Sequence, residues 1–280
     1  MRLRGVGKSR NIEDWRRAGG RGRAAGGIGG IGLLVVLAIG YFAGIDVTPL
    51  LQGSLEAPRQ TSGQLTAEDD RAADFTSGVL RTTEQVWARV FAEQLNRTYE
   101  PPILVLYSGV TQSPCGGASG ATGPFYCPAD RKAYLDTSFF RMMSERMGAR
   151  GDFAAAYVIA HEVAHHVQNE LGILRQVSQA RRAAGQAEAN ALTVRLELMA
   201  DCLSGVWARN VEGLMERGDL QEALNAARMI GDDHLQRQAG RVPQPHTLTH
   251  GTSDQRERWF GRGFDSGEIG TCDTFAAKRL

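Results

Sequence analysis

The chain has 280 residues and a formal net charge of +1. The charge is uneven, because residues 1–25 hold eight Lys and Arg residues against Glu13 and Asp14. The other residues therefore carry about −5 in total, which argues against a nucleic-acid partner for the larger part of the chain.

The first segment with a clear pattern is apolar and follows this basic stretch. Residues 24–45 contain no charged side chain, and about 20 apolar residues suffice to span a bilayer. We therefore expect a basic cytoplasmic tail over 1–25 and a transmembrane anchor over 26–45. The positive flank predicts a single-pass membrane protein with a cytoplasmic N-terminus and an extracytoplasmic domain. A cleaved signal peptide is the alternative.

Two further expectations concern this region. The glycines at Gly26/Gly30 and Gly40/Gly44 have the spacing of paired membrane helices, which allows a homo-oligomer through the anchor. The basic tail would then meet anionic lipid headgroups. Residues 46–66 are polar and contain proline and glycine, which predicts a linker.

Residues 67–280 have the length of one compact domain. The pattern predicts a long helix ending near Asn96, then a strand over 103–107 and another over 132–136. The strand over 132–136 is expected at the sheet edge, where an extended substrate can add to it. Beyond residue 138 the pattern is mostly helical, so the fold class is α+β, mostly helical with a small sheet.

All four cysteines, Cys115, Cys127, Cys202 and Cys272, follow the apolar segment. An even number of cysteines in an exported domain favours disulfides. Cys115 and Cys127 bracket a loop rich in glycine and proline, which favours pairing with each other and leaves Cys202 to pair with Cys272. The alternatives are a structural zinc site, for which the close spacing is missing, and a plain buried thiol at Cys202.

The most informative motif is His161-Glu162-Val163-Ala164-His165, within a segment of helical pattern. Two histidines four residues apart lie on one face of a helix, so both rings can reach one metal ion. A glutamate between them can take a proton from water activated by that ion. The motif therefore indicates a Zn²⁺ site with His161 and His165 as ligands and Glu162 as general base. The alternative is a buried helix with incidental histidines.

A catalytic zinc site needs a third protein ligand. Glu197 is the candidate, because it lies in an apolar helical segment where an unpaired carboxylate is costly. Asp201 lies one turn further on the same side and suits the role of holding a ligand histidine by its second nitrogen. The alternative is an exposed Glu197/Asp201 pair on the polar side of the helix.

Two other histidines have an informative sequence context. His166 follows His165 by about 100° of helix rotation, so it cannot share the ligand face and is expected to be structural or supporting. His250 precedes a capped helix start at Ser253 and could stabilise an oxyanion as a second catalytic residue. A solvent-exposed loop histidine is the alternative.

Several segments in order resemble a bacterial family, the membrane-anchored neutral zinc metallopeptidases, which are similar to the gluzincins. The matching segments are 113–117, 123–130, 134–140, 161–169, 197–202 and 249–251. The resemblance covers roughly residues 65–280. It implies a zincin-like fold, zinc held by His161, His165 and Glu197, and Glu162 as base.

The sequence thus predicts a zinc-dependent peptidase acting on a peptide or protein substrate. Two alternatives remain open. One is a non-catalytic envelope protein that keeps a metal for stability and binds a membrane or cell-wall partner. The other is a zinc hydrolase with a substrate other than a peptide, such as an amidase for cell-wall material.

Overall fold

The structure is a computed structural model that describes residues 1–17, 65–119, 123–211 and 213–280. Met1–Trp15 and Ala67–Leu280 together form one compact unit. The expected anchor over 26–45 lies outside the described residues, as does the expected linker except for its last two residues.

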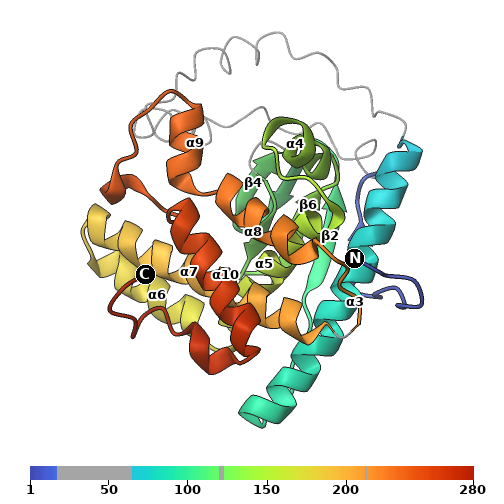
Figure 1. The fold of residues 1–280 in the computed structure, drawn as a ribbon, viewed down its shortest axis with the longest axis horizontal. Coiled ribbons are helices and arrows are strands. Elements are labelled where there is room, and N and C mark those ends of the chain that lie inside the picture. The colour runs from blue at the N-terminus through green and yellow to red at the C-terminus, as the bar shows by residue number, and fades with distance from the viewer. Residues whose placement is uncertain (18–64, 120–122, 212) are drawn as a thin grey trace. The chain divides into compact units, whose positions relative to one another are not determined.

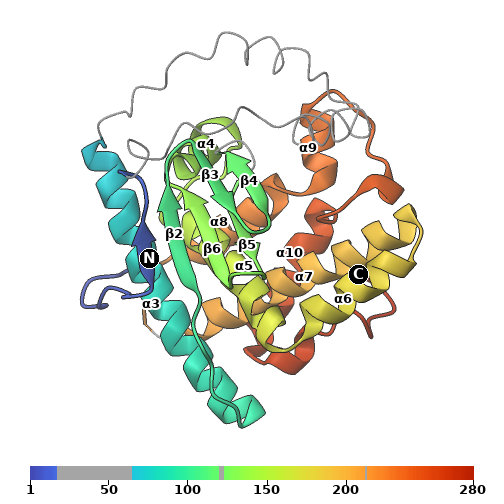
Figure 2. The same ribbon diagram turned by 180° about the vertical axis from the view of Figure 1, so that it is seen from behind.

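The main sheet has four strands in the order β1-β2-β6-β5. Their bounds are Ile12–Asp14 for β1, Ile103–Tyr107 for β2, Lys132–Asp136 for β6 and Phe125–Cys127 for β5. The first three strands are parallel and β5 is antiparallel to β6. Figure 2 shows β2, β6 and β5 side by side, with the hairpin of β3 (Val110–Ser113) and β4 (Gly116–Ser119) nearby.

The two predicted strands are confirmed, but the expected position of one is wrong. The strand over 132–136, β6, lies inside the sheet between β2 and β5. Both its edges are used by backbone pairing, so it cannot add a substrate strand. Among the described strands, β5 takes the end position next to β6.

Helices make up most of the rest, so the predicted α+β class with mostly helical content is confirmed. They are α3 (Ala67–Leu95), α4 (Ser138–Arg146), α5 (Asp152–Glu170), α6 (Ile173–Ala183), α7 (Gln186–Asn210), α8 (Asp219–Met229), α9 (Asp232–Gln238) and α10 (Ser253–Ser266). Two short 3₁₀ turns, η3 (Pro245–Thr247) and η4 (Ile269–Cys272), complete the described elements. Figure 1 shows α7 beside α10.

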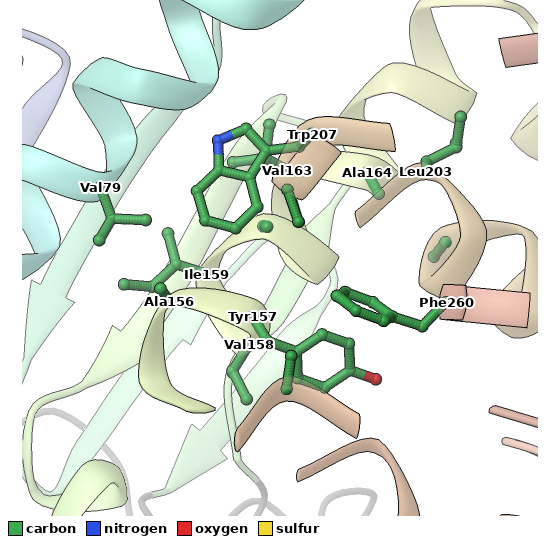
Figure 3. Close-up of a cluster of buried hydrophobic side chains, with 14 of the residues drawn as sticks. Val79, Ala156, Tyr157, Val158, Ile159, Val163, Ala164, Leu203, Trp207 and Phe260 are labelled. Atoms are coloured by element: carbon green, nitrogen blue, oxygen red, sulfur yellow. The ribbon is translucent and has the colours of Figure 1, made fainter. Parts of the chain in front are cut away.

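Helix α5 lies in the centre of the hydrophobic core. Its sequence is apolar on nearly every side, which is typical of a helix buried all round. In Figure 3, Tyr157 and Ile159 of α5 lie among Val79 of α3, Trp207 of α7 and Phe260 of α10, all of them buried. Burial of each such large side chain stabilises the fold by about 1.5–3 kcal/mol. The core therefore holds rigidly the helix that carries the His-Glu-x-x-His motif.

Both predicted disulfides are confirmed. Cys115 pairs with Cys127, and Cys202 pairs with Cys272. The second bridge ties α7 to the C-terminal turn η4 across 70 residues of chain. It thereby fastens the C-terminal segment to the helix that carries Glu197.

The expected single-pass membrane topology is wrong. No helix in the described parts of the chain combines the length and apolar character needed to cross a bilayer. In addition, β1 pairs with β2 of the domain, and the Met1 amino nitrogen lies 2.8 Å from Asp152 Oδ1. A bilayer cannot separate residues that share a sheet, so residues 1–15 and the domain lie on the same side of any membrane. Basic residues of this tail pair with domain carboxylates, as Arg2 does with Glu216.

Candidate metal centre

Helix α5 places the two motif histidines one turn apart. The rings of His161 and His165 have centroids 4.8 Å apart. Both α5 and the side chain of Glu162 are largely buried, and Glu162 is only 9% exposed.

Helix α5 begins at Asp152, where the Glu222 carboxylate of α8 accepts a hydrogen bond from the Phe153 N–H. This contact satisfies one of the first N–H groups of the helix.

Helix α7 brings Glu197 to these histidines. Glu197 Oε2 lies 3.1 Å from His161 Nε2, and Oε1 lies 3.5 Å from His165 Nε2. One potential ligand atom from each of the three residues lies within 4.8 Å of the others. The structure thus brings together the three residues that the sequence suggested as ligands. Two imidazoles and one carboxylate are a donor set that suits catalytic zinc.

Asp201 contacts His161 on the opposite side of the ring. Its Oδ1 accepts from His161 Nδ1 at 3.0 Å and from the Tyr157 hydroxyl at 2.5 Å. Its side chain is fully buried. An acceptor on Nδ1 leaves Nε2 as the free nitrogen of the neutral ring, and Nε2 is the atom that faces Glu197.

Gln168 does the same for His165. Gln168 Oε1 lies 2.9 Å from His165 Nδ1, and Gln168 Nε2 donates to the carbonyl of Leu196 at 2.6 Å. The amide therefore links the second histidine to the backbone of α7, one residue before Glu197. Each of the two histidines is oriented by a buried polar group of its own.

The buried imidazoles and carboxylates shift one another's pKa values. Burial opposes protonation of His161, but the hydrogen bonds to Asp201 and Glu197 outweigh it and raise its pKa to about 10. Burial alone would raise the pKa of Glu197, but the positive field of His165 and the hydrogen bonds from both histidines hold it well below its usual value. These carboxylates therefore favour a positive charge between them, which a metal ion would supply.

Glu162 lines the same cleft as His161, His165 and Glu197. Burial raises the pKa of its carboxyl group, and the nearby His165 and His161 partly offset this rise. A raised pKa brings a carboxylate closer to the range in which it can both take and return a proton at neutral pH.

His250 lies at the same cleft as the metal-ligand candidates. Its Nδ1 is 3.0 Å from Asp232 Oδ1, and its backbone N–H donates to Asp232 Oδ2 at 2.7 Å. Burial disfavours the charged ring, but the hydrogen bond to Asp232 outweighs it and raises the pKa of His250. The side chain is still 53% exposed, so it can meet a molecule in the cleft.

His166 points away from the candidate ligands. Its Nε2 lies 2.6 Å from the carbonyl oxygen of Glu100, and its Nδ1 lies 3.0 Å from the Tyr126 hydroxyl. Burial lowers the pKa of His166 to about 4, so the ring is neutral. It fastens strand β5, which carries Tyr126, onto α5.

The cleft has a volume of about 830 Å³, which is within the usual range for ligand pockets. Most of its wall is apolar. The apolar lining comprises Pro124, Phe125, Tyr126, Pro128, Phe139, Met142, Met147, Val158, Leu174, Val177, Leu196, Ile230 and Leu235. The His-Glu-x-x-His motif, Glu197 and His250 supply the polar groups of the same cleft.

Sequence reasoning missed four residues of this centre. Tyr157 and Gln168 stand one turn from the motif histidines, at four and three residues, and helical spacing could have identified them. Asp232 and Arg256 have no such local signal. Arg256 donates hydrogen bonds to the Asp201 carboxylate through two of its nitrogens.

Comparisons with known proteins identify a family for the chain. The sequence model of the family described as "Putative neutral zinc metallopeptidase" matches residues 1–275. The chain is 48% identical to the uncharacterized protein YpfJ of Escherichia coli K12, over 98% of this chain and 99% of YpfJ. It is 42% identical to the uncharacterized protein Rv2575 of Mycobacterium tuberculosis H37Rv, over 65% of each chain. No solved structure matches. The chain therefore belongs to the family of neutral zinc metallopeptidases that this description names.

Proposed function

We propose that the protein is a zinc-dependent peptidase. The observation that carries the proposal is the convergence of His161, His165 and Glu197, whose potential ligand atoms lie within 4.8 Å of one another. They stand in the wall of a cleft that also holds Glu162 and His250. A site meant only to stabilise the fold would be closed, whereas this one adjoins space for a substrate.

The residues present fit a zinc ion. Asp201 and Gln168 each hold the Nδ1 atom of one histidine, so both Nε2 atoms are free to bind a metal next to Glu197. When bound, zinc would lower the pKa of its bound water towards about 7 and would polarise a substrate carbonyl.

The protein's own groups would perform the proton transfers. Glu162 would accept the proton of the attacking water and pass it to the leaving amine, a task for which its raised pKa is suited. His250, whose positively charged form is favoured by Asp232, would donate a hydrogen bond to the oxyanion that forms at the carbonyl. The fold around the cleft leaves Glu162 only 9% exposed.

The cleft favours an extended peptide as the substrate. Strand β5 ends the described sheet, and its residues Phe125 and Tyr126 line the cleft. An extended chain can pair with the open edge of such a strand, while its side chains enter apolar parts of the wall. The contact between Tyr126 and His166 keeps this strand in place beside α5.

The test is the Glu162→Gln variant of the full chain, with the exposed Glu188→Gln on α7 as its control. We expect E162Q to bind one zinc ion like the wild type and to lose peptide cleavage, while E188Q keeps both. Cleavage of a mixed peptide library and zinc content by mass spectrometry are the measurements. Wild-type cleavage by E162Q would refute the proposal. A zinc-loaded wild type that cleaves amide bonds of cell-wall material but no peptide of the library would point instead to the amidase alternative.

A further inference from the structure

We propose that Arg256 is a positioning residue for the metal centre, acting through Asp201 on His161. The inference rests on the proposed function and deepens it. Arg256 stands on the first turn of α10 and is only 3% exposed. Its Nε donates to Asp201 Oδ2 at 2.9 Å, and its Nη2 donates to Asp201 Oδ1 at 2.9 Å.

The two-point contact fixes the plane of the Asp201 carboxylate. A guanidinium presents its N–H groups as a rigid fork, which matches the two oxygens of a carboxylate. A lysine ammonium in the same place would be a point charge and would leave the carboxylate free to rotate. Asp201 is fully buried, so no bulk water can replace this partner.

The orientation of Asp201 directly determines that of the His161 ring. The oxygen that Arg256 Nη2 holds, Oδ1, is the one that accepts from His161 Nδ1 and from the Tyr157 hydroxyl. Arg256 Nη2 also donates to Tyr157 Oη at 3.2 Å. Three donors therefore surround one oxygen atom, and each restricts the others. If Asp201 turned, the His161 ring would turn with it and its Nε2 would leave the direction of Glu197.

The net charge of the buried cluster also supports the role of Arg256 as a positioning residue. Metal ligation requires neutral imidazoles at His161 and His165. With Glu162, Glu197 and Asp201 ionised and Arg256 positive, the cluster then carries a net charge of minus two, which a divalent cation cancels. Without Arg256 the loaded centre would keep an unbalanced negative charge in a buried place, which is costly. Arg256 thus suits the centre to a dication in both geometry and charge.

Arg256 also joins the metal centre to the far side of the cleft. Its Nη1 donates to the carbonyl of Ile230 at 3.3 Å, at the end of α8. Ile230 lines the cleft, and the loop that leads into α10 carries His250. One guanidinium therefore makes hydrogen bonds to Tyr157 of α5, to Asp201 of α7 and to Ile230 at the end of α8.

The test compares Arg256→Gln and Arg256→Lys in the full chain with Arg258→Gln, an exposed arginine two residues further on the same helix. Zinc affinity is measured by competition with a chromogenic chelator. The visible absorption of the cobalt-substituted protein reports the coordination geometry, and urea unfolding checks the fold. We expect R256Q to bind zinc about 10- to 100-fold more weakly, with an altered cobalt spectrum. R256K should fall between R256Q and the wild type, and R258Q should match the wild type.

Each outcome decides the question. A folded R256Q with wild-type zinc affinity and cobalt spectrum would overturn the inference. If R256Q does not fold, R256K decides, because it keeps the charge but lacks the fork: wild-type affinity in R256K would overturn the inference and weaker binding would support it. Failure of the wild-type chain to bind zinc or cobalt would refute the proposed function itself, whereas equal binding by wild type and R256Q overturns the role of Arg256 alone.

Discussion

Gly263 of α10 lies directly against the backbone carbonyl of Cys202 on α7. A Cβ atom at position 263 would come within 1.8 Å of the Cys202 oxygen, far inside any real contact. Gly205 of α7 is in the same situation, since its Cβ would lie 2.0 Å from the carbonyl oxygen of Phe260. The two helices therefore touch through their backbones. This close approach allows Arg256 on α10 to reach into the metal centre.

The first prediction concerns this helix contact. Gly263→Ala should lower the free energy of unfolding by about 1–3 kcal/mol, because the methyl group must push the helices apart. Gly261→Ala is the matched control, since a Cβ there meets nothing within 4 Å. It should raise stability by about 0.5–1 kcal/mol through helix propensity. Urea unfolding of both variants measures the difference, and equal stability of G263A and G261A would contradict the packing.

The second prediction concerns Gln168. Its removal in Gln168→Ala takes the acceptor from His165 Nδ1 and removes the side-chain donor to the Leu196 carbonyl. We expect zinc affinity to fall about 10-fold or more, as is usual when a group that orients a ligand histidine is lost. Gln186→Ala, at an exposed position on α7, is the control and should bind zinc as the wild type does. Unchanged affinity in Q168A would show that helix α5 alone orients His165.

The third prediction separates His250 from the metal ligands. His250→Gln should reduce kcat about 100-fold or more, as expected for a lost oxyanion donor, while zinc content stays at the wild-type level. Asp232→Asn should act in the same direction with a smaller effect, because it weakens the charge on His250 without removing the ring. Peptide turnover and metal analysis of the same samples provide the test. Loss of zinc in H250Q would make it a ligand instead.

The fourth prediction concerns acid stability. Burial alone would raise the pKa of Asp233, but hydrogen bonds from Ser253 and from the Arg237 guanidinium outweigh it and lower the pKa. A lowered pKa means that the ionised Asp233 stabilises the fold above the unfolded-state value of about 4, and that this contribution disappears as the pH falls through the folded-state value. Asp233→Asn should therefore cost about 1–2 kcal/mol at neutral pH and progressively less in acid.

The measurement for Asp233 is urea unfolding of D233N and wild type across the acid range. Asp265→Asn, at an exposed position near the end of α10, serves as the control for a general charge effect. A difference between D233N and wild type that stays constant with pH would show that the contribution is steric and not electrostatic.

Local periodicity accounts for the parts of the site that could be predicted. His161 and His165 lie one turn apart on any α-helix, so their proximity followed once the segment was read as helical. Asp201 follows Glu197 by one turn for the same reason. The predicted strand over 103–107 is a short apolar run, and the one over 132–136 has an apolar centre between Lys132 and Asp136; both strands are present.

Contacts between distant segments could not be predicted from such patterns. Arg256 is 55 residues from Asp201, and in the sequence it looks like any other arginine of a polar helix start. Strand β1 has only three residues beside a basic run, too few to show an alternating pattern. The charge pattern of residues 1–25 instead suggested a tail, because the acidic partners of Arg2 and Lys8, which are Glu216 and Asp74, are distant in sequence.

The place of β1 in the sheet has a practical consequence for anyone who shortens the chain. Removal of everything before residue 67, a natural cut just after the expected linker, would take the neighbouring strand away from β2 and expose the backbone of β2 to other molecules. It would also take Ser9 and Asn11 from the buried Glu84 carboxylate. If the truncated protein aggregates, the cause would be the damaged sheet. Its lack of activity would then say nothing about the chemistry of the cleft.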